Sequence, residues 1–177
     1  MTAESQRLIL NFMLWCLLPL WVIAGVADYS LHRRTSIETT SGFTESKLHV
    51  LEAAEVGALL FLGLFLQSTT LVLWLMVVLA LAHTLSALWD SAWTAPRRLI
   101  SPLEQHVHSH LEYIPLIAVS LLVLMHWGQP WDFSFRWRDP AVPLPYLLAV
   151  LLPIFLVQGV LLGEETWRTW RRRADVD

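Results

Sequence analysis

Apolar residues are gathered into five long runs along this chain, separated by shorter segments rich in polar and proline residues. A transmembrane helix needs about 20 apolar residues, because each residue advances about 1.5 Å through a hydrocarbon core roughly 30 Å thick. The runs cover about 8–27, 51–66, 71–93, 113–127 and 146–163. The second and fourth runs are short, so they must extend backwards through polar residues in order to cross a membrane. We therefore predict helices over about 8–32, 45–67, 71–93, 103–127 and 145–165.

The composition supports an all-α integral membrane protein. Hydrophobic residues make up 55% of the 177 positions and charged residues only 15%, which is unlike an ordinary soluble domain. The first run is longer than the roughly 7–15 apolar residues of a secretory signal, so we expect it to remain as a membrane helix. The prediction is a single transmembrane helical domain over residues 1–177 with five spans.

Positive charge is divided unevenly between the two sides of these spans. With five spans, nine of the twelve Lys and Arg residues fall on the side of the C-terminus, and the other three are Arg7, Arg136 and Arg138. Short loops rich in Lys and Arg stay in the cytoplasm. We therefore predict a bacterial inner-membrane protein with its N-terminus outside and its C-terminus in the cytoplasm. The formal net charge of −3 argues against a nucleic-acid partner.

Ionisable residues gather at the predicted cytoplasmic ends of four spans. Six of the seven histidines lie there, and only His126 lies at the predicted outer surface. Residues three, four or seven apart share one face of a helix, and each of the four spans carries histidine and carboxylate side chains at such spacings. These stripes contain Asp28 and His32; Glu45, His49 and Glu52; His83 and Asp90; and Glu104, His108 and Glu112.

Carboxylates and imidazoles that project inward from four helices are the means by which a helical bundle holds two metal ions. We therefore predict that four spans form a bundle with a polar metal-binding site near the cytoplasmic side, and that the ten residues of the stripes are its candidate ligands. Nitrogen and oxygen ligands suit iron, and also zinc or manganese. The number of ligands favours two ions, with iron the first choice. Further candidates outside the stripes are Glu38, Glu55, His106 and His110.

A simpler interpretation places these side chains at the membrane interface, where water and headgroups reach them. Acids in the first turn of a helix, such as Glu45 and Glu104, are also favoured by the helix dipole. Near the C-terminus, Glu164 and Glu165 are expected to balance the arginines that follow them. The coincidence on four helices favours the metal site, because carboxylates inside a membrane are costly unless they are paired or bound.

Two stretches carry a resemblance to known families. The segments "ADYSLHRRTSIETTSGFTESKLHVLEAAEVG" and "SPLEQHVHSHLE" resemble a group of small bacterial multi-helix membrane proteins of uncharacterised function, over roughly Asp28 to Glu112. In its chemistry the chain is similar to membrane-bound di-iron desaturases and hydroxylases, whose sites also face the cytoplasm. It lacks their HxxHH box, and His49-xx-Glu52 reverses the ExxH element of soluble ferritin-like proteins.

These observations favour a membrane metalloprotein that works as a di-iron oxidoreductase on a lipid or lipid-like substrate, with a redox partner. A zinc-dependent membrane lipid hydrolase is the second hypothesis, although it leaves the additional glutamates without a role. Metal or proton transport, or metal storage, is the third, and it lacks matching polar residues in the outer halves of the spans. A bis-histidine haem protein is disfavoured, because carboxylates beside the axial ligands would have no function. The oligomeric state stays open.

Overall fold

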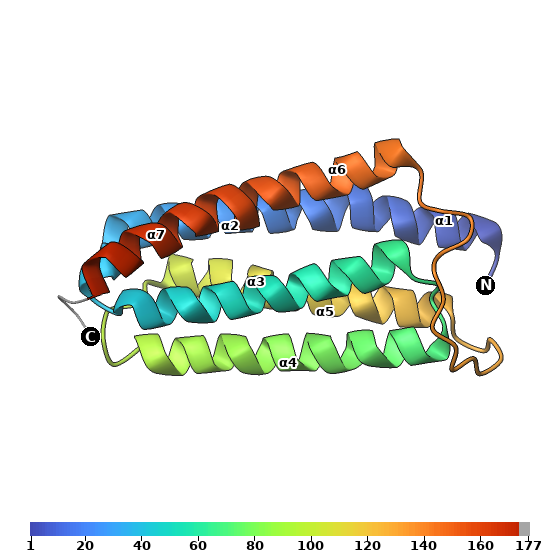
Figure 1. Cartoon of the computed structure of the whole chain (residues 1–177), viewed down its shortest axis with the longest axis horizontal. Helices are drawn as coiled ribbons and strands as arrows, with labels where there is room; N and C mark the ends of the chain where they lie inside the picture. The colour runs from blue at the N-terminus through green and yellow to red at the C-terminus, as the bar shows by residue number, and fades with distance from the viewer. Residues whose placement is uncertain (174–177) are drawn as a thin grey trace.

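The computed structural model describes residues 1–173, and over this range the chain folds into five long helices that run alternately up and down (Figure 1). Two of the five contain a π-helical segment. The first consists of α1 (Ala3–Phe12), η1 (Met13–Leu17) and α2 (Leu18–Thr35). The next three are α3 (Gly42–Phe65), α4 (Thr70–Thr94) and α5 (Pro102–Met125). The last consists of α6 (Leu144–Ile154), η3 (Phe155–Leu161) and α7 (Leu162–Arg172), and a short 3₁₀ turn, η2 (Ile37–Thr39), precedes α3.

All five helices are long and apolar enough to cross a membrane. Their bounds agree with the predicted ones to within three residues, except at the start of the first helix and at the end of the last. The first begins at Ala3, because the side chain of Thr2 caps it by accepting a hydrogen bond from the Ser5 amide. The last continues to Arg172 beyond its apolar run, where a pair such as Arg168 with Glu164, four residues apart, supports a polar helix.

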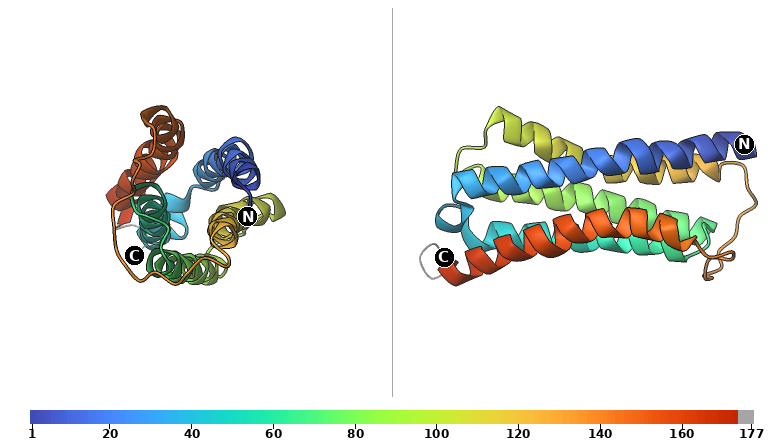
Figure 2. Two further views of the ribbon diagram at one scale, coloured as in Figure 1. Left: turned by 90° about the vertical axis from the view of Figure 1, so that its right-hand side faces the viewer. Right: turned by 90° about the horizontal axis from the view of Figure 1, so that it is seen from above.

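The helices form one bundle in which the last helix also takes part. α2 packs against α5, α5 against α4, α4 against α3, and α3 against α7, while α2 also approaches α6 and η3 (Figure 2). The polar stripes predicted on four helices thus have α7 as a fifth neighbour. We call the end of the bundle that contains the end of α2 and the start of α3 the cluster end, and the opposite end, with the connection between α5 and α6, the loop end.

Local sequence explains how the cluster end is built. Ser36 adopts a left-handed conformation (φ 51°) after α2 and turns the chain toward α3. Ser101 caps α5 by accepting a hydrogen bond from the Glu104 amide at 3.1 Å, and Pro102 occupies the first position of the helix, where its missing N–H has no cost. Asp90 lies in the last turns of α4 and Glu104 in the first turn of α5, so both face the same end of the bundle.

The apolar interior consists of two adjoining clusters in the middle and at the loop end. One is built by α3, α4 and α5 around Leu62, Val72 and Met76. The other joins Trp21 and Val56 to residues of α5, α6 and η3. Many large apolar side chains instead point outward, among them Trp15, Ile23, Leu85 and Leu88, which are at least 65% exposed. An outer surface of this kind suits lipid rather than water.

Candidate metal centre

Charged and polar side chains from all five helices converge inside the cluster end of the bundle. The polar cluster, as we call it, consists of Asp28, His32, Glu45, His49, Asp90, Glu104, His108 and Glu165. His32, Glu45 and Glu104 have no exposed surface. Burying ionised groups costs several kcal/mol each unless other charges or hydrogen bonds compensate them, so the contacts inside the cluster decide what it can do.

Glu165, on α7, fixes the orientation of two imidazole rings. His32 Nδ1 donates to one carboxylate oxygen of Glu165 at 2.9 Å, and His49 Nδ1 donates to the other at 2.7 Å. The two rings stack with centroids 4.8 Å apart and an interplanar angle of 3°. When these rings are neutral, both Nε2 atoms carry no proton, and they face the interior of the cluster. Histidines that bind metal ions are commonly held in this way, with the other ring nitrogen donating to a carboxylate.

The two Nε2 atoms face carboxylate oxygens at distances longer than hydrogen bonds. His32 Nε2 lies 3.6 Å from Asp28 Oδ1, 3.6 Å from Glu104 Oε1 and 3.9 Å from Glu45 Oε1. His49 Nε2 lies 3.7 Å from Asp90 Oδ1 and 4.0 Å from Glu45 Oε1. Ligand atoms bound about 2.1 Å from one cation are roughly 3–3.5 Å apart, so these separations are slightly wider than those of a coordination sphere.

Several of these buried atoms lack any hydrogen-bond partner within residues 1–173. They are His32 Nε2, His49 Nε2, Asp90 Oδ1, Glu52 Oε1 and Glu104 Oε2. With neutral imidazoles and ionised carboxylates all of them are acceptors, so they cannot satisfy one another. Buried polar groups in folded proteins are normally paired, and a metal cation is a partner that converging imidazole and carboxylate groups can share. The donor set therefore fits metal ions.

Two sets of three side chains bring their ligand atoms within 4.8 Å of one another: Asp28, His32 and His108, and His32, Glu45 and His49. His32 belongs to both sets, but its Nδ1 is engaged by Glu165, so its Nε2 can serve only one ion. His108 Nε2 lies 2.8 Å from Asp28 Oδ1 on one side of His32. His49, with Glu45 and Asp90, lies on the other side and could hold a second ion.

Arg98, in the connection between α4 and α5, compensates part of the negative charge. Its guanidinium lies 2.6 Å from Glu45 Oε1 and 2.6 Å from Glu104 Oε1, with 3% of the side chain exposed. Burial alone would lower the pKa of Arg98, but the hydrogen bonds and charges of Glu45 and Glu104 raise it above its ordinary value. Glu45 also accepts a short hydrogen bond from Ser41. Arg98 is therefore a permanent cation beside these two carboxylates.

A small cavity of about 90 Å³ adjoins the cluster, and Asp28, His49, Glu52, His83 and Glu165 are among its lining residues. Glu52 and His83 thus lie beside the polar cluster rather than within it. His83 Nδ1 is 3.4 Å from Glu55 Oε2. Glu55 also accepts a hydrogen bond from Ser86 at 2.9 Å, so these three residues form a separate polar group deeper in the bundle.

The remaining sequence candidates lie elsewhere. Glu112 is half-buried on α5 and makes no ion pair within the described part of the chain. Glu38 pairs with Arg168. His106 is exposed, and His110 Nδ1 donates to its backbone carbonyl at 2.8 Å. His126, at the loop end, donates to the carbonyl of Leu122.

Sequence reasoning missed Glu165 and Arg98. The expectation that Glu165 balances the following arginines was wrong, because its carboxylate is 2% exposed and binds His32 and His49. Its neighbour Glu164 does pair with arginine, at 3.0 Å from Arg33. A signal for Glu165 was present in the sequence, since it continues the buried stripe of Val150, Ile154 and Val157 at helical spacing.

The fold and the polar cluster define a helical protein with five potential membrane spans and a buried group of histidines and carboxylates at one end. Comparison of the chain with protein-family models, with curated proteins and with solved structures finds no match. The resemblance to small bacterial membrane proteins therefore stays a prediction, and the function has to be argued from the site.

Proposed function

We propose that this protein is a membrane metalloenzyme with a pair of metal ions, iron in the first place, that oxidises a lipid-like substrate. One observation carries the proposal. A single buried carboxylate, Glu165, holds the Nδ1 atoms of His32 and His49, so that both Nε2 atoms face buried carboxylate oxygens 3.6–4.0 Å away and have no hydrogen-bond partner within residues 1–173. This is the arrangement of imidazoles that bind metal ions.

The charge of the site supports two dications rather than one. Six carboxylates belong to the cluster or line its cavity, and Arg98 is the one guanidinium that contacts them within residues 1–173. With all six carboxylates ionised and the imidazoles neutral, the excess is five negative charges, which a pair of dications reduces to one. These carboxylates are Asp28, Glu45, Glu52, Asp90, Glu104 and Glu165.

The ligand chemistry favours iron. Imidazole and carboxylate together suit iron, manganese and zinc, and helical bundles that hold two iron ions use this mixture of ligands. An iron pair supplies oxygen activation when it is bound. His32, His49 and His108 would supply imidazole ligands, and Glu104, whose Oε2 has no hydrogen-bond partner within residues 1–173, would supply a carboxylate ligand.

The chain's own residues provide the remaining requirements. Arg98 compensates the charge of Glu45 and Glu104 and holds them in place. Trp21 and Val56 form apolar walls of the small cavity, where they would exclude water from a reactive site. Oxidation of a C–H bond by dioxygen takes two electrons from the substrate and two from a donor. A redox partner that docks at the cluster end is therefore part of the proposal.

A zinc-dependent lipid hydrolase is the second candidate, because one observation favours it. Asp28, His32 and His108 bring two imidazoles and one carboxylate together, which is a ligand set of catalytic zinc sites that keep one open position for water. It leaves the second set around His49 without a role. Oxygen consumption separates the two candidates.

Metal analysis of the detergent-purified protein tests the proposal. We expect about two iron ions per chain and oxygen consumption after reduction. The Glu165→Gln variant should bind the metal roughly 10–100-fold more weakly, because an amide cannot accept from both Nδ1 atoms in the same way. The matched control is Glu164→Gln, whose carboxylate accepts from Tyr29 and Arg33 outside the cluster and should keep both ions.

Two results would contradict the proposal. Protein that neither carries nor takes up iron, manganese or zinc has no metal centre. Protein that holds zinc and stays inert toward oxygen after reconstitution with iron is a hydrolase instead. The His126→Ala variant, altered at the loop end, should keep its metal; if it loses metal, the assignment of the site to the polar cluster is wrong.

A further inference from the structure

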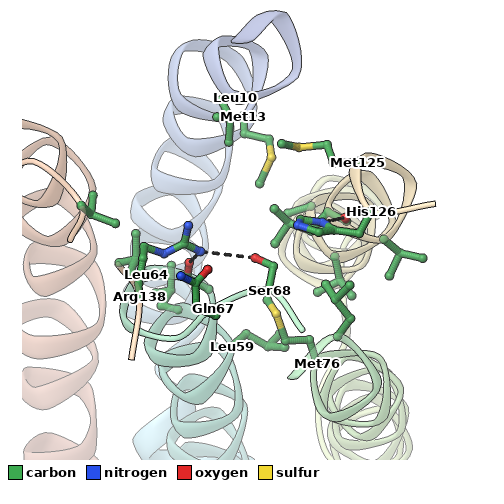
Figure 3. A pocket seen from close by; sticks show the side chains of 18 of the residues that line it. Leu10, Met13, Leu59, Leu64, Gln67, Ser68, Met76, Met125, His126 and Arg138 are labelled. Atoms are coloured by element: carbon green, nitrogen blue, oxygen red, sulfur yellow. Dashed lines mark hydrogen bonds between the residues drawn. The ribbon is translucent and has the colours of Figure 1, made fainter. Parts of the chain in front are cut away.

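A second and much larger cavity, of about 1690 Å³, occupies the loop end of the bundle. Its walls come from all five helices and are mainly apolar; Figure 3 shows Leu10, Met13, Leu59, Leu64, Met76 and Met125 around it. Pockets for small molecules measure roughly 300–1,000 Å³, so this space suits a larger apolar molecule. At the loop end, the ribbons of α1 and α6 are separated from each other on the outer side of the bundle (Figure 2).

The charge of this cavity is positive. Three of its lining side chains are charged, and two of them, Asp132 and Arg136, pair with each other. Arg138 has no carboxylate partner within residues 1–173: it donates to the carbonyl of Gly63 at 2.7 Å and to Ser68 at 3.3 Å (Figure 3). Its Nε is buried and unpartnered. Partial burial lowers the pKa of Arg138, so the guanidinium is partly desolvated and has no carboxylate counter-ion within residues 1–173.

Arg138 is held firmly in this position. Its backbone amide donates to the carbonyl of Phe65 at 2.8 Å, and the amide of Gln67 donates to the carbonyl of Arg136 at 3.0 Å. The loop segment is therefore tied to the end of α3 by a backbone bridge between Leu66 and Trp137, the residue before Arg138. A planar guanidinium fixed at the edge of an apolar cavity is suited to bind a phosphate or carboxylate group.

The large cavity leads toward the polar cluster. Trp21 and Val56 line both this cavity and the small one beside the cluster. Along α3, Gly63 beside Arg138 is seven residues from Val56 and fourteen from His49, or about 10 Å and 21 Å at the helical rise. One lipid chain covers about half of a hydrocarbon core of roughly 30 Å. A chain anchored at Arg138 thus reaches Val56 and, if long, approaches the cluster.

We propose that the large cavity binds a long-chain lipid with an anionic headgroup, whose phosphate or carboxylate pairs with Arg138 while its chain extends past Trp21 and Val56 toward the metal centre. This inference rests on the proposed function, for which it names the substrate class: an anionic lipid from the leaflet at the loop end. The position oxidised lies far from the headgroup, near the distal end of the chain.

Native mass spectrometry of the full-length, metal-loaded protein tests this inference, with phosphatidylglycerol and phosphatidylcholine of identical chains as probes. We expect tighter binding of phosphatidylglycerol. Arg138→Gln should weaken that binding about tenfold, the effect of losing one charge-assisted contact. It should weaken binding of phosphatidylcholine less, because the choline of that lipid already offsets its phosphate charge. The matched control is Arg136→Gln in the same loop, because Arg136 is exposed and already paired with Asp132. This variant should still bind phosphatidylglycerol more tightly than phosphatidylcholine.

A second variant tests the cavity itself. A Cβ at Gly63 would already lie 3.4 Å from the terminal methyl of Met76, so Gly63→Leu places a side chain in the space of the lipid chain. It should weaken binding of both lipids, with melting temperature and metal content measured on the same sample to show that the bundle remains folded.

Several outcomes would overturn the inference. They are equal binding of the two lipids, equal effects of Arg138→Gln and Arg136→Gln, displacement of the lipid by inorganic phosphate at the same concentration, or a dimer whose formation excludes lipid. If the metal content is normal when one of these results is obtained, the proposed metal centre is not contradicted. Absence of metal together with Arg138-dependent lipid binding contradicts the proposed function and leaves a lipid-binding site.

Discussion

At the scale of single residues, the cluster depends on side chains that each serve two partners. Glu165 accepts from two histidines, and Arg98 contacts two glutamates. Each therefore stabilises contacts between helices far apart in sequence. Loss of one such residue leaves two buried groups without a partner, which costs more than the loss of a single surface contact.

Arg98→Gln is predicted to destabilise the protein, and more strongly without metal. The substitution leaves Glu45 and Glu104 buried and uncompensated, which costs about 3–5 kcal/mol for a broken buried pair. Bound dications would supply part of the missing positive charge, so the loss of melting temperature should grow after chelation. Thermal unfolding with and without chelator measures both effects.

The control for this prediction is the neighbouring arginine. Arg97 is exposed and stacks on the Trp93 ring, with its guanidinium carbon 3.3 Å from the ring centroid. Arg97→Gln should therefore cost about 1 kcal/mol or less. If chelation leaves the effect of Arg98→Gln unchanged, metal ions do not share the charge balance of these glutamates.

At the scale of the helices, the close approach of α2 to η3 positions α7 over the cluster. Gly25 on α2 faces Val157 on η3, and a Cβ at Gly25 would overlap with a methyl group of Val157. Glu165 follows Val157 by two helical turns, so the spacing at this glycine helps to set the distance from Glu165 to His32. π-helical segments such as η3 often occur at functional sites.

Gly25→Ala is predicted to destabilise the bundle by about 1–3 kcal/mol through overpacking and to weaken metal binding, because α7 is displaced. Adding Val157→Ala removes the methyl group involved and should restore both properties. The measurements are thermal unfolding and metal content of the single and double variants.

The matched control is Gly57→Ala on α3, since a Cβ there meets no atom within 4 Å. It should be neutral or stabilising by up to about 1 kcal/mol, as expected when alanine replaces glycine in a helix. A double variant that remains as unstable as Gly25→Ala would disprove the role assigned to this contact.

At the scale of the whole molecule, the two halves of the bundle differ in character. The cluster end contains buried charge and a cavity of about 90 Å³, while the loop end contains a mainly apolar cavity of about 1690 Å³. The outer surface between them carries large exposed apolar side chains such as Trp15, Leu85 and Leu88. This asymmetry suits metal chemistry at the cluster end and lipid binding at the loop end.

The distribution of Lys and Arg predicts which end faces the cytoplasm. Nine of the twelve basic residues lie on the side of the cluster end, so we expect the C-terminus and the polar cluster in the cytoplasm. A reporter fused to the C-terminus that is active only in the cytoplasm should be active, and one that needs the periplasm should be silent. The opposite pattern would place the metal centre on the outer side.

The sequence by itself determined the five helices and the end of the bundle at which ionisable residues gather. Both follow from local properties, namely runs of apolar residues and the spacing of polar ones on a helix. Of the ten candidate ligands, seven lie in the polar cluster, and Glu52 and His83 line the adjoining cavity. Glu112 lies outside both.

Only the tertiary structure decided which charged residues complete the site. Glu165 is 133 residues from His32 and 116 from His49, and Arg98 is 53 residues from Glu45, so local spacing does not show which partners they bind. The sequence does not reveal the large cavity either, because its walls are ordinary apolar helix positions. In the sequence, Arg138 does not differ from other cations in loops. Which buried charges find partners depends on how the helices pack against one another, and the periodicity of a single helix does not contain that information.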